Sequence, residues 1–199
     1  MNVRRIALGA SATLLAIGTV VGMGAGVAGA AKPVVSATGT ANCSATGKIK
    51  ASPALAIPGS NAPATLTTKV TISGCTGTSG VVSGKGTFTS QVPTNNCTAL
   101  QTTDPLPATG TIKWKGAAKY SPSAITFSDS SSTTSDPITS TAPGSGTSTI
   151  TGSFANEHAL SKEVLDQGVA ELLAGCTGKG IKKLSFTGVH GASTFKITP

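Results

Sequence analysis

The sequence predicts a mainly β protein: an antiparallel, immunoglobulin-like β-sandwich with one short helix near residues 161–174 and two disulfides. Three observations support this class. Short segments alternate between apolar and polar residues, which is typical of strands with one buried face. Of the 199 residues, 54 are Ser or Thr, 25 are Gly and 11 are Pro, which suits polar strand faces and turns. Charged residues make up 11% of the chain, too few for a coiled coil or a long helical bundle.

The first thirty residues have the pattern of a cleaved export signal. The Arg4-Arg5 pair precedes an uncharged stretch over 6–27, and Ala28-Gly29-Ala30 offers the small residues that signal peptidase recognises. A retained membrane helix is the alternative, because the apolar stretch is long enough to span a bilayer. The small residues at its end favour export by Sec and cleavage between Ala30 and Ala31.

The expected mature chain, residues 31–199, forms a single secreted or envelope-associated domain. It carries 13 lysines, no arginine and 7 acidic residues, for a formal charge of +6. Arginine is the residue that binds phosphate and guanine bidentately, so its absence argues against specific nucleic-acid recognition. The expected partner is an acidic polymer of the cell wall or another surface protein. Contact with the membrane is expected only through the signal, before cleavage.

Four cysteines in an exported chain predict two disulfides. Cys43 and Cys97 each stand in an Asn-Cys-(Ser/Thr)-Ala word, whereas Cys75 and Cys176 each stand in Gly-Cys-Thr-Gly. Spacing alone leaves three connectivities open. If the repeated words mark two related halves, the bonds are Cys43–Cys75 and Cys97–Cys176. A metal site is not expected, because the chain has no Cys-x-x-Cys pair.

Several strands follow from the period-two alternation, with Gly-, Pro-, Asn- and Ser-rich turns between them. Their spacing suits a sandwich of about seven to ten strands. Residues 121–150 contain 17 Ser or Thr, and we expect polar edge strands there with a mobile tip at 128–136. The residues expected to face the core are Leu66, Val70, Ile72, Ile112, Trp114, Ile125, Phe127, Ile138, Leu184, Phe186, Phe195 and Ile197.

The one predicted helix covers residues 161–174. Ser161 is a suitable N-cap, and Gly175 is expected to end the helix. The acidic residues of this segment are expected on a solvated face. The apolar residues with helical spacing are Val164, Leu165, Val169, Leu172 and Leu173.

Short sequence words stand in a recognisable order along the chain. A cysteine opens the first strand, Gly-Cys-Thr-Gly closes the first unit, Gly-Thr-Ile-x-Trp occupies 110–114 and Gly-Ser-Phe-Ala occupies 152–155. With a later cysteine followed by an apolar strand, this set resembles small secreted proteins of actinobacteria that have an immunoglobulin-like sandwich character and no known function. The resemblance covers most of the mature chain. It implies export and the fold class, and it implies no catalytic residue.

The sequence shows no constellation of catalytic, cofactor-binding or metal-binding residues. We therefore predict an exported, non-enzymatic binding or structural domain without a cofactor. One alternative is a small secreted hydrolase built on His158, before the predicted helix, or on His190, in a predicted hairpin turn; no Gly-x-Ser-x-Gly motif supports it. Another is a carbohydrate-binding module that stacks sugars on Trp114 and Tyr120. Trp114 is expected in the core instead, because it alternates with lysines.

Overall fold

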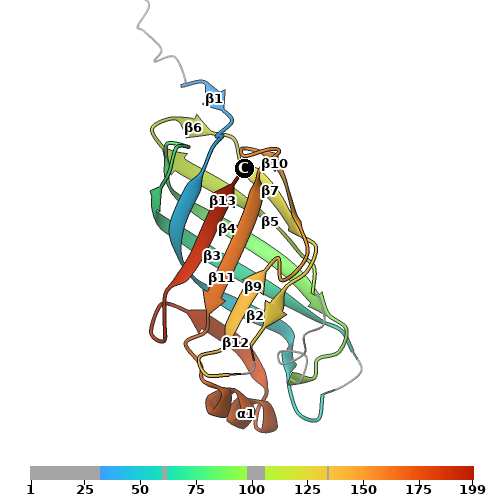
Figure 1. Cartoon of the computed structure of the whole chain (residues 1–199). Helices are drawn as coiled ribbons and strands as arrows, with labels where there is room; N and C mark the ends of the chain where they lie inside the picture. Colours follow the sequence, from blue (N-terminus) through green and yellow to red (C-terminus); the bar gives the residue numbers. More distant parts are fainter. Residues whose placement is uncertain (1–31, 60–61, 98–105, 134) are drawn as a thin grey trace, which may run out of the picture. The chain divides into compact units, whose positions relative to one another are not determined.

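The computed structural model describes residues 32–59, 62–97, 106–133 and 135–199 of the chain. The predicted signal and its cleavage site at Ala30 and Ala31 lie outside the described residues. Within them, the chain builds an antiparallel sheet that curls on itself, one helix, and a small parallel pair of β1 (Val34–Val35) and β6 (Lys119–Tyr120) (Figure 1). The predictions of a mainly β, antiparallel fold with one helix and two disulfides are confirmed.

The main sheet is continuous, with ten of its strands hydrogen-bonded along one path, whereas a sandwich has two packed sheets. The order is β10-β7-β5-β4-β3-β2-β13-β11-β9-β8, with β12 also paired to β2. The strands of this sheet are β2 (Ala41–Leu55), β3 (Ala64–Thr76), β4 (Val81–Val92), β5 (Ala108–Gly116), β7 (Ser123–Phe127), β8 (Ser131–Ser132), β9 (Thr139–Ala142), β10 (Ser148–Gly152), β11 (His158–Val164), β12 (Ile181–Phe186) and β13 (Ser193–Thr198).

The long strand β2 explains why one sheet makes both walls. This strand of 15 residues pairs with β3 along one edge. Along its other edge, the carboxyl-terminal half of β2 pairs with β12 and the amino-terminal half pairs with β13. At Gly47 a Cβ would collide with the Phe186 ring and the Lys69 carbonyl, so only glycine permits this close packing in the strand. Both β12 and β13 are antiparallel to β2, so they run in the same direction. Residues 187–192 therefore connect two strands that continue along β2, and the chain does not reverse there. The predicted hairpin turn at His190 is therefore wrong.

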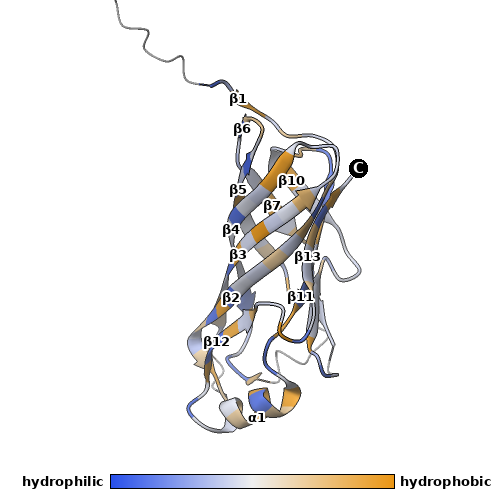
Figure 2. Cartoon of the chain, turned by 90° about the vertical axis from the view of Figure 1, so that its left-hand side faces the viewer, coloured by the Kyte–Doolittle hydropathy of each residue, from blue (hydrophilic) through white to orange (hydrophobic). Residues whose placement is uncertain are grey.

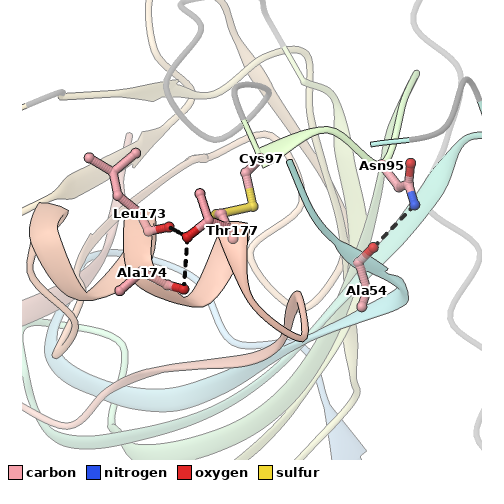
Figure 3. The surroundings of a disulfide bond; sticks show 7 residues. Ala54, Asn95, Cys97, Leu173, Ala174 and Thr177 are labelled. Carbon is pink, nitrogen blue, oxygen red and sulfur yellow. Dashed lines mark hydrogen bonds between the residues drawn. A yellow bond between two sulfur atoms is a disulfide. The ribbon is translucent and has the colours of Figure 1, made fainter. Parts of the chain in front are cut away.

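The predicted helix is correct only in its second half. The helix α1 spans Val169–Thr177, while Ser161 lies in β11 and is not an N-cap. The backbone of β11 pairs with β13 and β9, and these long-range hydrogen bonds outweigh the local helical spacing of apolar residues. The helix continues past Gly175, and Thr177 Oγ1 donates to the carbonyl oxygens of Leu173 and Ala174 at 3.1 and 3.3 Å (Figure 3). No helix among the described residues is long and apolar enough to cross a membrane.

Two clusters of buried side chains fill the curl. The aromatic cluster holds all five phenylalanines and Trp114, and the aliphatic cluster holds no aromatic ring. Figure 2 shows hydrophobic and hydrophilic bands interspersed along largely pale strands. Buried and exposed residues alternate with period two, for example along β7 and β13. Every side chain predicted to face the core is buried. Leu66, Ile138, Leu184, Leu55, Leu165 and Leu172 belong to the aliphatic cluster, and Val70, Ile72, Phe88, Trp114, Phe154 and Phe195 to the aromatic cluster.

The two disulfides have the predicted connectivity. Cys43–Cys75 joins the neighbouring strands β2 and β3. Cys97–Cys176 joins α1 to a segment 79 residues away in sequence (Figure 3). Backbone hydrogen bonds support this second bond, since Cys97 N donates to Ala56 O at 3.1 Å and Ile57 N to Cys176 O at 2.8 Å. The repeated cysteine words therefore identified the pairs correctly.

Candidate functional site

A hollow of about 120 Å³ lies inside the curl, where the two clusters meet. The aromatic cluster contributes Phe88, Phe127 and Phe195 to its lining, and the aliphatic cluster contributes leucines of β3, β12 and α1. Hydroxyl groups from β3, β4, β8, β9 and β11 interrupt the apolar surface. A mostly apolar cavity with a few convergent polar groups is the usual form of a small-molecule site.

Glu163 is the ionisable residue of this hollow, and β11 places it there. Alternate residues of a strand share one face, so Ser161 and Glu163 point inward together, and Leu165 continues the series beyond the strand. In the pairing of β11 with β9, Glu163 lies directly opposite Ser140. The expectation that the acids of this segment face solvent is wrong for Glu163. The alternation of 159–165 carried the correct signal, but the helical spacing concealed it.

The carboxyl group of Glu163 has little compensation for its burial. Among the described residues it accepts a hydrogen bond from Ser161 Oγ at 3.5 Å, which is long for a charged acceptor. No other ionisable side chain of the described residues lines the hollow. Burial raises the pKa of Glu163 to about 7, and the Ser161 hydroxyl only partly opposes this shift. The group is therefore close to half protonated at neutral pH.

Two aspartates show the opposite arrangement. Asp129 accepts backbone hydrogen bonds from Ser145, Gly146 and Gly144, and these donors hold its pKa below the ordinary value. Desolvation raises the pKa of Asp166, but hydrogen bonds donated by the Thr187 backbone N–H and hydroxyl help to bring this pKa below its usual range. Both carboxylates therefore hold loops of this chain in place through hydrogen bonds. Glu163 has no such structural task among the described residues.

The outer surface of the same sheet forms a second candidate site, which we call the lysine face. It consists of Lys48, Lys50, Lys69, Lys85, Lys113 and Lys183, all exposed. Lys48 lies directly opposite Lys69 across β2 and β3, Lys85 opposite Lys113 across β4 and β5, and Lys50 opposite Lys183 across β2 and β12. The strands β2, β3, β4, β5 and β12 contain no Asp or Glu. In the sequence these lysines lie far apart, and only the strand register brings them together on one face.

The remaining residues considered in the sequence analysis lie apart from the hollow. His158 and His190 are exposed, and among the described residues no hydrogen bond or ion pair joins either imidazole to a carboxylate. Trp114 is 6% exposed, packs edge-on against Phe154 at 5.2 Å and donates its Nε1–H to Ser123 Oγ at 2.8 Å. It is therefore a core residue, as predicted, and it offers no face for sugar stacking. Tyr120 is half-buried, and its hydroxyl donates to Ser79 O.

Comparison of the chain with protein-family models, with curated proteins and with solved structures found no match. The hollow and the lysine face are therefore the features that bear on function.

Proposed function

We propose that this chain is an exported, non-enzymatic binding protein that attaches to acidic polymers of the cell envelope through its lysine face. The observation that carries the proposal is the direct opposition of lysines in three strand pairs. Like charges directly opposite each other destabilise a sheet. A face that concentrates them without any acid is suited to a polyanion, which relieves the repulsion when it binds.

The chemistry of the face suggests loose attachment. Lysine ammonium groups are hydrated point charges, and they do not form the bidentate contacts that arginine makes with phosphate or carboxylate. Attraction between exposed charges is screened by salt over about 8–10 Å at physiological ionic strength. We therefore expect binding to acidic polysaccharides or polymer phosphates that depends on charge density and salt, with little preference for one sugar sequence.

Export is part of the same proposal. Two disulfides fit an oxidising compartment, and the sequence of residues 1–30 has the pattern of a Sec signal. The resemblance to secreted actinobacterial proteins of immunoglobulin-like character agrees with this location. Amino-terminal sequencing of protein recovered from culture medium is expected to begin at Ala31. A recovered chain that begins at Met1 would contradict the cleavage.

The attachment is tested by co-sedimentation of the purified mature protein with isolated cell wall and with polygalacturonate, over a series of salt concentrations. The variant Lys48→Gln/Lys69→Gln/Lys85→Gln/Lys113→Gln removes four charges from the lysine face. The matched control Lys32→Gln/Lys119→Gln/Lys162→Gln/Lys196→Gln removes four exposed charges elsewhere, two of them from β11 and β13. Both variants have the same net charge.

We expect the lysine-face variant to lose most of its binding, and the control to keep most of it. Equal losses in the two variants would mean that net charge alone governs attachment, and the proposed site would be wrong. The lysine-face variant should also be slightly more stable than the parent, by about 0.2–1 kcal/mol per opposed pair relieved, in urea unfolding.

A further inference from the structure

We propose that the hollow is a second binding site, for a small monocyclic amine whose ammonium group pairs with Glu163. This inference concerns the inside of the curl and does not depend on the lysine face. It follows from the volume of the hollow, the chemistry of its lining and the position of Glu163, the one carboxyl group among the described residues that line it.

The size of the hollow matches one ring with a short substituent. Its volume is about 120 Å³. For comparison, an engineered cavity of roughly 150 Å³ lined by aliphatic and aromatic side chains binds benzene. An occupant that lies wholly inside the hollow is therefore no larger than a ring of benzene size with a short substituent.

The carboxyl group of the hollow lies beside two hydroxyl groups on β11 and β9, while Thr68 and Ser90 add hydroxyl groups from β3 and β4. Glu163 and Ser161 face inward from β11, and Ser140 is the register partner of Glu163 on β9. An ammonium group has three N–H donors and no acceptor. One carboxylate and two hydroxyls from adjacent strands supply the three acceptors that such a group needs.

The charge of the lining selects among ligands. None of the chain's lysines lines the hollow, so its Glu163 carboxylate has no internal cation. A carboxylate ligand would meet a like charge, and a hydrocarbon would leave the half-buried Glu163 carboxylate without an ionic partner. A protonated amine neutralises the charge of Glu163 and donates a charge-assisted hydrogen bond to its carboxylate. The raised pKa of Glu163 agrees with a carboxyl group that lacks this partner.

The apolar lining suits the rest of the ligand. Phe88, Phe127 and Phe195 line the hollow from β4, β7 and β13, and leucines complete the lining. Phenyl faces attract cations as well as rings, because the π system is negative above the ring plane. A ring that packs among these side chains places an attached methylammonium group in the same hollow as the Glu163 carboxyl group.

The proposal is tested with four probes that share one skeleton: benzylamine, benzyl alcohol, toluene and benzoate. Binding is measured by NMR titration and calorimetry near pH 8, above the pKa of Glu163 and below that of an alkylamine. We expect benzylamine to bind on the order of tenfold or more tighter than benzyl alcohol or toluene, and benzoate to bind weakest. This ranking is measured in the unmodified protein, so it does not require any variant to fold.

Three variants locate the binding. Glu163→Gln is expected to lose the preference for benzylamine while it keeps toluene binding. Glu171→Gln removes an exposed acid from α1 and should change nothing. Ala142→Leu adds bulk to a residue that lines the hollow, and we expect it to weaken binding of all four probes.

The results separate the possible errors. Toluene binding as tight as benzylamine, or full benzylamine affinity in Glu163→Gln, would refute the pairing with Glu163. Absence of binding by every probe would refute the hollow as a site for molecules of this size. Neither result bears on cell-wall attachment, because the co-sedimentation assay concerns lysines on the opposite face of the sheet.

Discussion

The aromatic cluster and the aliphatic cluster stabilise their two parts of the sheet by different means. In the aromatic cluster, the ring centroid of Trp114 lies 5.2 Å from that of Phe154 and 6.1 Å from that of Phe195. Buried serines complete its hydrogen bonding, since Ser123 Oγ accepts from the Trp114 indole and donates to Ser153 O at 2.6 Å. Its disulfide joins strands that are already hydrogen-bonded neighbours.

The aliphatic cluster has fewer constraints of this kind. Its helix has nine residues and a glycine at the N-cap position with no side-chain cap, so it is too short to be stable alone. Cys97–Cys176 and the backbone bonds around it tie this helix to distant segments. The comparison indicates that rings and buried hydrogen bonds stabilise one part, and a long-range cross-link stabilises the other.

Removal of the Cys97–Cys176 disulfide should give the largest effect, and removal of Cys43–Cys75 a smaller one. For Cys97→Ser/Cys176→Ser the loop of 79 residues corresponds to about 4.5 kcal/mol of lost stability, and for Cys43→Ser/Cys75→Ser the loop of 32 residues corresponds to about 3.7 kcal/mol. Urea unfolding measures both values. Hydrogen exchange should show lost protection of α1 only in the first variant. Equal loss of α1 protection in both variants would break the distinction between the two parts.

Truncation of one large side chain in each cluster should give the next largest effects. Phe154 is fully buried, its φ is 64°, and its N–H donates to Ala37 O at 2.6 Å. We expect Phe154→Ala to cost about 4 kcal/mol, because packing on all sides is lost. Leu172 already borders the hollow, so Leu172→Ala should cost only about 2 kcal/mol, at the low end for leucine. Thermal unfolding of the two variants tests this order, and a reversed order would contradict it.

Glu163 lies between the clusters and should make stability depend on pH. Its pKa is raised from 4.5 to about 7 in the folded chain, so between these values the folded state binds more protons than the unfolded state. The contribution of Glu163 to the free energy of unfolding should therefore be largest below about pH 4.5. It should fall by about 2–3 kcal/mol as the pH rises to about 7. No other ionisable group lines the hollow from the described residues of the surrounding strands or α1.

The variant Glu163→Gln should remove this slope, and Glu171→Gln should keep it. Urea unfolding at a series of pH values distinguishes the two variants from the parent. A slope that persists in Glu163→Gln would mean that another group titrates across this range.

The smallest expected effect concerns the buried hydroxyl of the aromatic cluster. Ser123→Ala leaves the Trp114 indole N–H without its acceptor and Ser153 O without its donor. A buried unpaired donor costs about 1–3 kcal/mol, and we expect about 1–2 kcal/mol in urea unfolding. Ser90→Ala is a suitable control, because Ser90 lines the hollow and is only half-buried. A loss no larger than that of the control would show that the buried serines are dispensable.

The sequence was most informative where one local signal decided the structure. Period-two alternation placed Leu66, Trp114 and Phe195 in the core, and repeated words around the cysteines identified both disulfides. It was misleading over 161–168, where helical spacing and a good N-cap competed with alternation. That error also assigned Glu163 to the wrong surface. Ser123 could not be distinguished among 54 Ser and Thr residues, because only its contact with Trp114 makes it special.

By itself, then, the sequence indicated the β class, the disulfide pairs and the core face of most strands, because the signal for each, an alternation or a repeated word, lies in residues near one another in the chain. Only the tertiary structure decided that one curled sheet encloses a hollow, that β11 directs Glu163 into it, and that lysines of neighbouring strands lie opposite one another. These features depend on strand register. Register is set by hydrogen bonds between distant segments, and a shift of one residue would turn every side chain to the other face.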